Sequence, residues 1–145
     1  MNKAFYDFTV YNIHDSENFN EIVSGSNERR ILIAFLDEQR DELEAFMKKI
    51  ISAAKLELEK DCLILRGAES SFIPTFTQIK SSHKIEKAVL FGIKGKDLGF
   101  NIETPLYIPF SFNHCQFLFA NKLSVIENSV EQKKALWHGL QTLFL

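Results

Sequence analysis

Three short apolar runs, separated by segments of helical character, limit most strongly what this chain can fold into. The runs are RILIAFL at 30–36, DCLILR at 61–66 and KAVLFGI at 87–93. Apolar residues occupy consecutive positions in them, which is typical of short strands buried on both faces of a parallel sheet. Such strands, alternating with helices, form β-α-β units. We therefore expect an α/β domain with a mostly parallel central sheet and helices on both faces, a three-layer α/β/α arrangement.

A long amphipathic helix is predicted between the first two runs, over residues 38–58. Asp37 precedes it and is a candidate N-cap. Apolar residues recur at spacings of three and four, which places them on one helix face. They are Leu43, Phe46, Met47, Ile50, Ile51, Ala54 and Leu58.

The remaining elements are shorter. Residues 70–82 predict a short helix with Pro74 in its first turn, and HCQFLFA at 114–120 predicts a fourth strand. Asn121 is a candidate cap for a short helix after that strand. Residues 129–144 predict a closing helix, with Leu136, Leu140, Leu143 and Phe144 on one side.

Two segments leave alternatives open. Residues 1–29 fit either an N-terminal docking arm or an edge element of the sheet. Residues 101–110 contain Pro105 and Pro109 and fit an edge strand or an irregular excursion. We assign residues 30–145 to a single α/β domain, because 145 residues suit one core and no linker interrupts them.

Charge and cysteine usage restrict the function. The net charge is −2, from 17 basic and 19 acidic residues, which argues against binding nucleic acid directly through its phosphates. No signal-like segment begins the chain, and no apolar stretch approaches the roughly 18 residues of a membrane span. Cys62 and Cys115 lie in apolar runs, as buried reduced thiols do. We expect a cytoplasmic protein that does not associate with membranes.

Phenylalanine is unusually frequent, with 14 residues against three tyrosines and one tryptophan. Such side chains either fill a core or mark a protein interface. Our hypothesis for partner docking names the aromatic residues of the N-terminal segment and of the proline-bounded segment. They are Phe5, Tyr6, Phe8, Tyr11, Tyr107, Phe110 and Phe112.

The alternative is a small nucleotide-binding or nucleic-acid-modifying enzyme. The segment GIKGKDLG at 92–99 follows a predicted strand, where α/β proteins commonly bind ligands. Its glycine spacing matches no phosphate-binding motif. The ligand contacts of this alternative would be Lys94, Lys96 and His114. The spacing of His and Cys residues predicts no metal site, and we expect no catalytic residue and no cofactor.

The end of the chain resembles the psi subunit of bacterial DNA polymerase III. The resemblance is carried by residues 120–129 (ANKLSVIENS) and 133–137 (KKALW), followed by Leu140. Its motif residues are Lys133, Leu136 and Trp137.

The resemblance implies a Rossmann-like domain related in fold to uracil-DNA glycosylases but without their activity. It also implies a non-enzymatic accessory subunit of the clamp-loader assembly. The partners implied are a clamp-loader subunit and a chi-like subunit, both bound by protein-protein docking. The Asp-Pro-Tyr and His-Pro-Ser signatures of the glycosylases are absent from the sequence.

Overall fold

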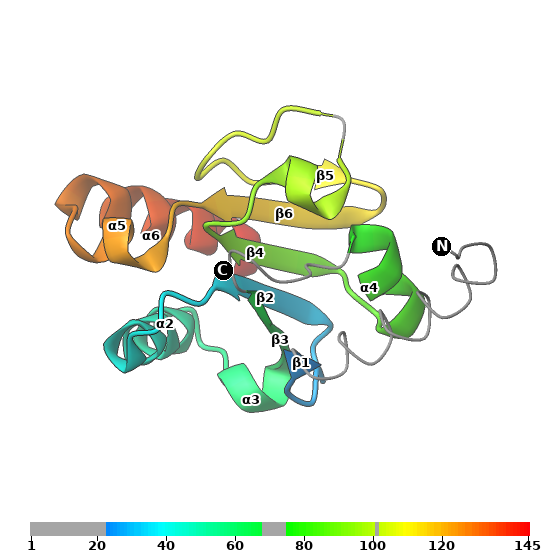
Figure 1. Cartoon of the computed structure of the whole chain (residues 1–145), viewed down its shortest axis with the longest axis horizontal. Helices are drawn as coiled ribbons and strands as arrows, with labels where there is room; N and C mark the ends of the chain where they lie inside the picture. The colour runs from blue at the N-terminus through cyan, green and yellow to red at the C-terminus, as the bar shows by residue number, and fades with distance from the viewer. Residues whose placement is uncertain (1–22, 68–74, 101) are drawn as a thin grey trace, which may run out of the picture.

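The computed structural model describes residues 23–67, 75–100 and 102–145, and these form a six-stranded sheet covered by helices (Figure 1). The strands lie in the order β1-β3-β2-β4-β6-β5. Their bounds are β1 Val23–Ser24, β2 Ile31–Leu36, β3 Cys62–Gly67, β4 Lys87–Phe91, β5 Phe110–Phe112 and β6 Cys115–Ala120. The prediction of an α/β domain is confirmed.

The sheet is mixed. Its four central strands are parallel, whereas β1 pairs antiparallel with β3, and β5 pairs antiparallel with β6. Antiparallel pairing is therefore confined to the two short edge strands. Ile31 on β2 lies beside Cys62 on β3 and Lys87 on β4, so the central strands start level. Their carboxyl ends therefore meet at one edge of the sheet.

Two cores lie on opposite faces of the sheet. In β2, Ile31, Ile33 and Phe35 belong to one core, and Leu32 and Ala34 to the other. The first core is covered by helices α2 (Asp41–Ala53), α3 (Leu58–Asp61), α5 (Leu123–Glu127) and α6 (Val130–Phe144). The second is covered by α4 (Phe76–Ser82) and the 3₁₀ helix η1 (Gly95–Leu98). This two-sided burial is why the strand sequences are apolar at consecutive positions.

The predicted helix at 38–58 is in fact two helices, α2 and α3. Lys55 between them has a φ of +65°, a left-handed conformation that ends the first helix. Asp37 is not the N-cap, because α2 begins at Asp41 after Arg40. The Asp37 carboxylate instead accepts the backbone N–H of Gln39 at 2.8 Å, within the loop.

Two further helix starts bear on the prediction. Within the described residues, helix α4 begins at Phe76, and Thr75 caps it by accepting the N–H of Gln78; Pro74 and the predicted start of this helix lie outside the described residues. Helix α5 follows Lys122, whose own side chain makes no capping hydrogen bond, so Asn121 is not its cap. The closing helix is confirmed, with the Ser129 hydroxyl accepting the N–H of Gln132.

The segment after residue 22 is attached to the sheet. Val23–Ser24 form an edge strand, and the N–H of Ser26 donates to the carbonyl of Glu59 at 2.8 Å. Residues 1–22 lie outside the described residues. The described part of the 101–110 segment, residues 102–110, combines both alternatives, since Phe110 opens β5 while Leu106 makes one isolated bridge to Phe119. Within the described ranges, no helix has both the length and the apolarity to cross a lipid bilayer.

Candidate functional site

An apolar groove of about 260 Å³ lies between α2 and α6. Spacing along α6 explains its composition, because positions 133, 136, 137 and 140 fall on one helix face. The groove is lined by Phe46, Lys49, Ile50 and Ala53 from α2, by Ile126 from α5, and by Lys133, Leu136, Trp137 and Leu140 from α6. All three motif residues of the psi resemblance therefore line one surface feature.

The groove has a buried floor and half-buried aromatic walls. Leu136 and Leu140 are buried in the first core, whereas Phe46 and Trp137 pack against that core and remain half exposed. The Lys133 ammonium lies 5.9 Å from the centre of the Phe46 ring, within the range of a cation–π contact. Exposed Lys49 adds a second positive charge to the rim. The groove can thus accept an apolar segment that carries acidic residues beside it.

A larger cavity, of about 1020 Å³, opens at the carboxyl ends of β4 and β6. Lys94 and Lys96 line it and are exposed, so the structure places both in one site. Lys122, which follows β6, lies there too. This third lysine is absent from the sequence-based alternative, because nothing in the chain order indicates that the two loops meet.

His114 does not join these lysines. It precedes β6, in the turn after β5, with a φ of +66°. It lies beside Glu86 and Lys87, at the amino ends of the parallel strands. Lys94, Lys96 and His114 therefore do not form a single ligand site, since they sit at opposite ends of the sheet.

The aromatic docking candidates fall into two groups. Phe5, Tyr6, Phe8 and Tyr11 lie outside the described residues. Phe110 and Phe112 are half-buried and pack on the second core, where their ring centres lie 5.9 Å from Phe119 and 5.1 Å from Phe100, respectively.

Tyr107 is half-buried and makes polar contacts with two segments. Its hydroxyl donates to the Gln132 side-chain oxygen at 2.5 Å and accepts the backbone N–H of Asn121 at 3.3 Å. Burial raises the pKa of this phenol. These contacts tie the loop before β5 to the start of α6, so Tyr107 has a structural role whether or not a partner binds.

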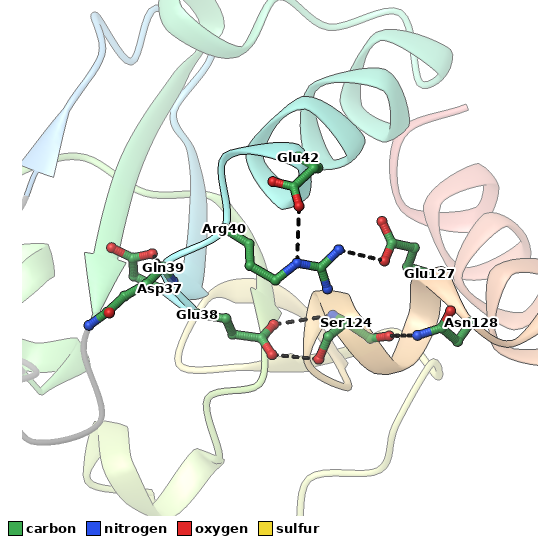
Figure 2. A network of polar contacts seen from close by, with 8 residues as sticks. All are labelled: Asp37, Glu38, Gln39, Arg40, Glu42, Ser124, Glu127 and Asn128. Carbon is green, nitrogen blue, oxygen red and sulfur yellow. Dashed lines mark hydrogen bonds and ion pairs between the residues drawn. The ribbon is translucent and has the colours of Figure 1, made fainter.

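Sequence reasoning missed a polar network that joins the β2–α2 loop to α5 (Figure 2). The Glu38 carboxylate accepts both the hydroxyl and the backbone N–H of Ser124. Arg40 pairs with Glu127 at 3.3 Å and with Glu42 at 3.2 Å. The hydrogen bond that Arg40 donates to the Glu42 carboxylate raises the pKa of Arg40. The pKa of Glu42 is lowered by a hydrogen bond from its own backbone and then by Arg40.

Cys62 and Cys115 are both buried, free cysteines. Burial raises the pKa of Cys62 to about 12, so its nucleophilic thiolate is scarce at neutral pH. The buried Cys115 thiol donates to the carbonyl of Ile85 at 3.0 Å. Across the described ranges, no three His, Cys, Asp or Glu residues come together in an arrangement that could hold a metal ion.

No family model matches the chain, and no similar sequence was found among curated proteins. The psi resemblance therefore depends on the quoted C-terminal residues alone. The motif residues among them, Lys133, Leu136 and Trp137, all line the α2–α6 groove, which makes this groove the candidate functional site.

Proposed function

We propose that this chain is a psi-like, non-enzymatic accessory subunit of the bacterial clamp-loader assembly, which acts by docking other proteins. One observation carries the proposal. Lys133, Leu136 and Trp137, the residues on which the resemblance depends, line the same apolar groove between α2 and α6.

The fold is compatible with this assignment. The central strands run in the order β3-β2-β4-β6, all parallel, with helices packed on both faces. We propose that this part of the domain has the Rossmann-like, three-layer architecture related to uracil-DNA glycosylases. Kinship of fold would carry no glycosylase activity with it. As a replisome component the protein would be cytoplasmic.

The chemistry of the groove defines its occupant. Trp137 and Phe46 offer large, half-exposed rings, the kind of side chain that contributes most to protein interfaces. An amphipathic helix binds such a groove through apolar residues on one of its faces. Lys49 and Lys133 on the rim favour acidic residues at the edge of that helix. We propose that a segment of this kind, from a chi-like or clamp-loader subunit, fills the groove.

The test is recovery of replisome proteins from a native lysate of the source organism with the tagged full-length chain. The double variant Lys49→Glu/Lys133→Glu reverses the rim charge and leaves the apolar floor intact. The matched control is Lys60→Glu/Lys134→Glu, which changes two exposed lysines outside the groove. We expect the wild type and the control to recover a clamp-loader or chi-like subunit, and the groove variant to lose at least nine-tenths of it.

Circular dichroism and thermal unfolding of both variants establish that they remain folded. The proposal fails if replisome proteins are absent from every eluate across several salt concentrations. It fails equally if the groove variant and the control recover the same amount. Recovery of unrelated proteins alone counts against it.

A further inference from the structure

The cavity at the carboxyl ends of β4 and β6 has walls of two kinds. Lys94 and Lys96 project from the turn after β4, and Lys122 follows β6. Against these three lysines, the part of the lining that the structure describes contains a single acid, Glu103. The cavity is thus positively charged although the whole chain has a net charge of −2. A local positive field of this kind attracts anions.

The lining also contains exposed apolar side chains. Among the described residues, six large apolar side chains are exposed, and three of them, Ile102, Leu106 and Val125, line this cavity. Their exposed fractions are 42%, 46% and 41%. Exposed apolar side chains collected in a concave surface, beside a few charged groups, are typical of a small-molecule site.

Backbone contacts hold the walls in place. The N–H of Tyr107 donates to the carbonyl of Phe119 at 2.8 Å, which fixes the apolar loop along β6. The N–H of Gly92 donates to the carbonyl of Ala120 at 2.9 Å and joins the two loops that carry the lysines. A Cβ added to Gly95 would lie 2.5 Å from the Thr104 methyl, so the lysine turn packs directly on the apolar loop. The cavity is therefore formed before any ligand arrives.

The usual ligand position in an open α/β sheet, the point where strand order reverses, is closed here. That point lies between β2 and β4. A Cβ added to Gly92 would lie 2.9 Å from Lys122 and 3.5 Å from Leu36, so these side chains fill the space. The Glu38–Ser124 contacts bridge from the end of β2 to α5 above it (Figure 2). A ligand is left with the neighbouring edge, between β4 and β6.

We propose that this cavity binds a nucleoside 5′-phosphate. The phosphates would lie against Lys94, Lys96 and Lys122, and the base against Ile102, Leu106 and Val125. Several ammonium groups suit a polyanionic phosphate better than a single carboxylate, and a flat base suits an open apolar wall. A volume of about 1020 Å³ is at the upper end of the range for small-molecule pockets, which leaves room for a nucleotide. This site shares no lining residue with the α2–α6 groove, so it is a second function, independent of docking.

Calorimetry on the full chain, in low salt with EDTA, tests the proposal with ATP, AMP, adenosine and inorganic phosphate as probes. We expect ATP to bind more tightly than AMP, because it carries more negative charge. We expect adenosine and phosphate each to bind at least tenfold more weakly than AMP, because each meets only one wall. Amide chemical shifts should change at residues 92–96, 102–106 and 119–125, and stay unchanged in α2.

The double variant Lys94→Gln/Lys96→Gln should raise the Kd for ATP at least tenfold. Its matched control, Lys60→Gln/Lys134→Gln, removes two exposed lysines elsewhere and should leave the Kd within twofold. Leu106→Asn, which makes the apolar part of the lining polar without adding charge, should weaken AMP binding and leave phosphate binding unchanged.

Three results would overturn the proposal. The first is the absence of binding by any nucleotide at millimolar concentration. The second is an equal loss of affinity in the variant and the control, which would indicate a general charge effect. The third is binding of a ten-residue oligothymidylate at least tenfold more tightly than ATP, which would identify a single-stranded nucleic-acid surface instead.

Discussion

Glu38 and Ser124 lie 86 residues apart in the chain, and the Glu38 carboxylate accepts two hydrogen bonds from Ser124. One comes from the Ser124 backbone N–H at 3.1 Å and the other from its hydroxyl at 2.5 Å. This pair joins the loop after β2 to the first turn of α5 and passes the end of β4, which lies between β2 and β6 in the sheet. It therefore fixes α5, which borders both the α2–α6 groove and the lysine-lined cavity.

Removal of this contact should destabilise the domain. We expect Glu38→Ala to lower the free energy of unfolding by about 1–2 kcal/mol, since hydrogen bonds to charged groups contribute about 1.5–3 kcal/mol and this pair is only partly buried. Ser124→Ala should cost less, because the backbone N–H still donates. Chemical denaturation of both variants and of the double variant measures their coupling. The exposed Ser52→Ala is the control, and additivity of the two changes would contradict the contact.

A second prediction concerns Gly139 in α6, which packs against the sheet. A Cβ there would lie 2.7 Å from a Leu118 methyl and 3.2 Å from the backbone oxygen of Tyr107. Alanine favours a helix over glycine by about 1 kcal/mol, but overpacking a buried contact costs about 1–3 kcal/mol. Leu118 is fully buried and the Tyr107 oxygen is backbone, so neither yields easily. Gly139→Ala should therefore be destabilising by denaturant titration.

Two variants check that reason. Leu118→Val makes room beside the new methyl, so the double variant Leu118→Val/Gly139→Ala should be more stable than the sum of the single changes predicts. Gln141→Ala, at an exposed position of the same helix, should change stability by less than about 0.5 kcal/mol. A gain of stability in Gly139→Ala would show that helix propensity outweighs packing at this position.

The central strands were predictable because they are buried on both faces, and consecutive residues in them are therefore apolar. Residues 30–36 and 87–93 contain β2 and β4 almost unchanged, and 114–120 contains β6. The break between α2 and α3 was not predictable, because Ala54 and Leu58 continue the apolar spacing of the helix although the backbone turns at Lys55. The spacing of apolar residues indicates which side chains are buried, but it does not indicate the backbone conformation between them.

The candidate groove was predictable only in part. The apolar face of α6, with Leu136 and Leu140, follows from its spacing. That Phe46 and Ile50 of α2 face it across a groove depends on how the two helices pack on the sheet, and no local pattern encodes this. The pairing of Glu38 with Ser124 has the same origin, since the residues meet through strand order.

The Cys62 thiol predicts a pH dependence of stability. Burial raises its pKa from an ordinary value of 9.0 to about 12. Below about pH 9 the thiol is protonated in the folded and unfolded chains alike. Between pH 9 and 12 the unfolded chain loses this proton and the folded chain keeps it, so stability should fall as pH rises. The contribution to the slope cannot exceed about 1.4 kcal/mol per pH unit.

Denaturant titrations from pH 8 to 10.5 measure that slope. Burial also raises the pKa of Tyr107, so Tyr107 lowers the free energy of unfolding in the same direction near the upper end of this range. All proteins compared must therefore keep Tyr107. Cys62→Ala should show a shallower slope than the wild type. Ile51→Val, a mild core change that keeps Cys62, should show the wild-type slope at lower stability. Equal slopes in all three would exclude a contribution from Cys62.

Trp137, the only tryptophan, reports on the α2–α6 groove. It is half-buried, so its indole emission should lie between those of a buried and a free indole, and acrylamide should quench it partially. Unfolding should shift the emission to longer wavelength, since it removes the contact with the first core. Trp137→Ala should lower stability by about 2 kcal/mol, roughly half the loss for a fully buried ring, because part of the indole is already solvated. An emission spectrum that denaturant leaves unchanged would mean that the indole does not pack on the first core, and the groove would then lack one wall.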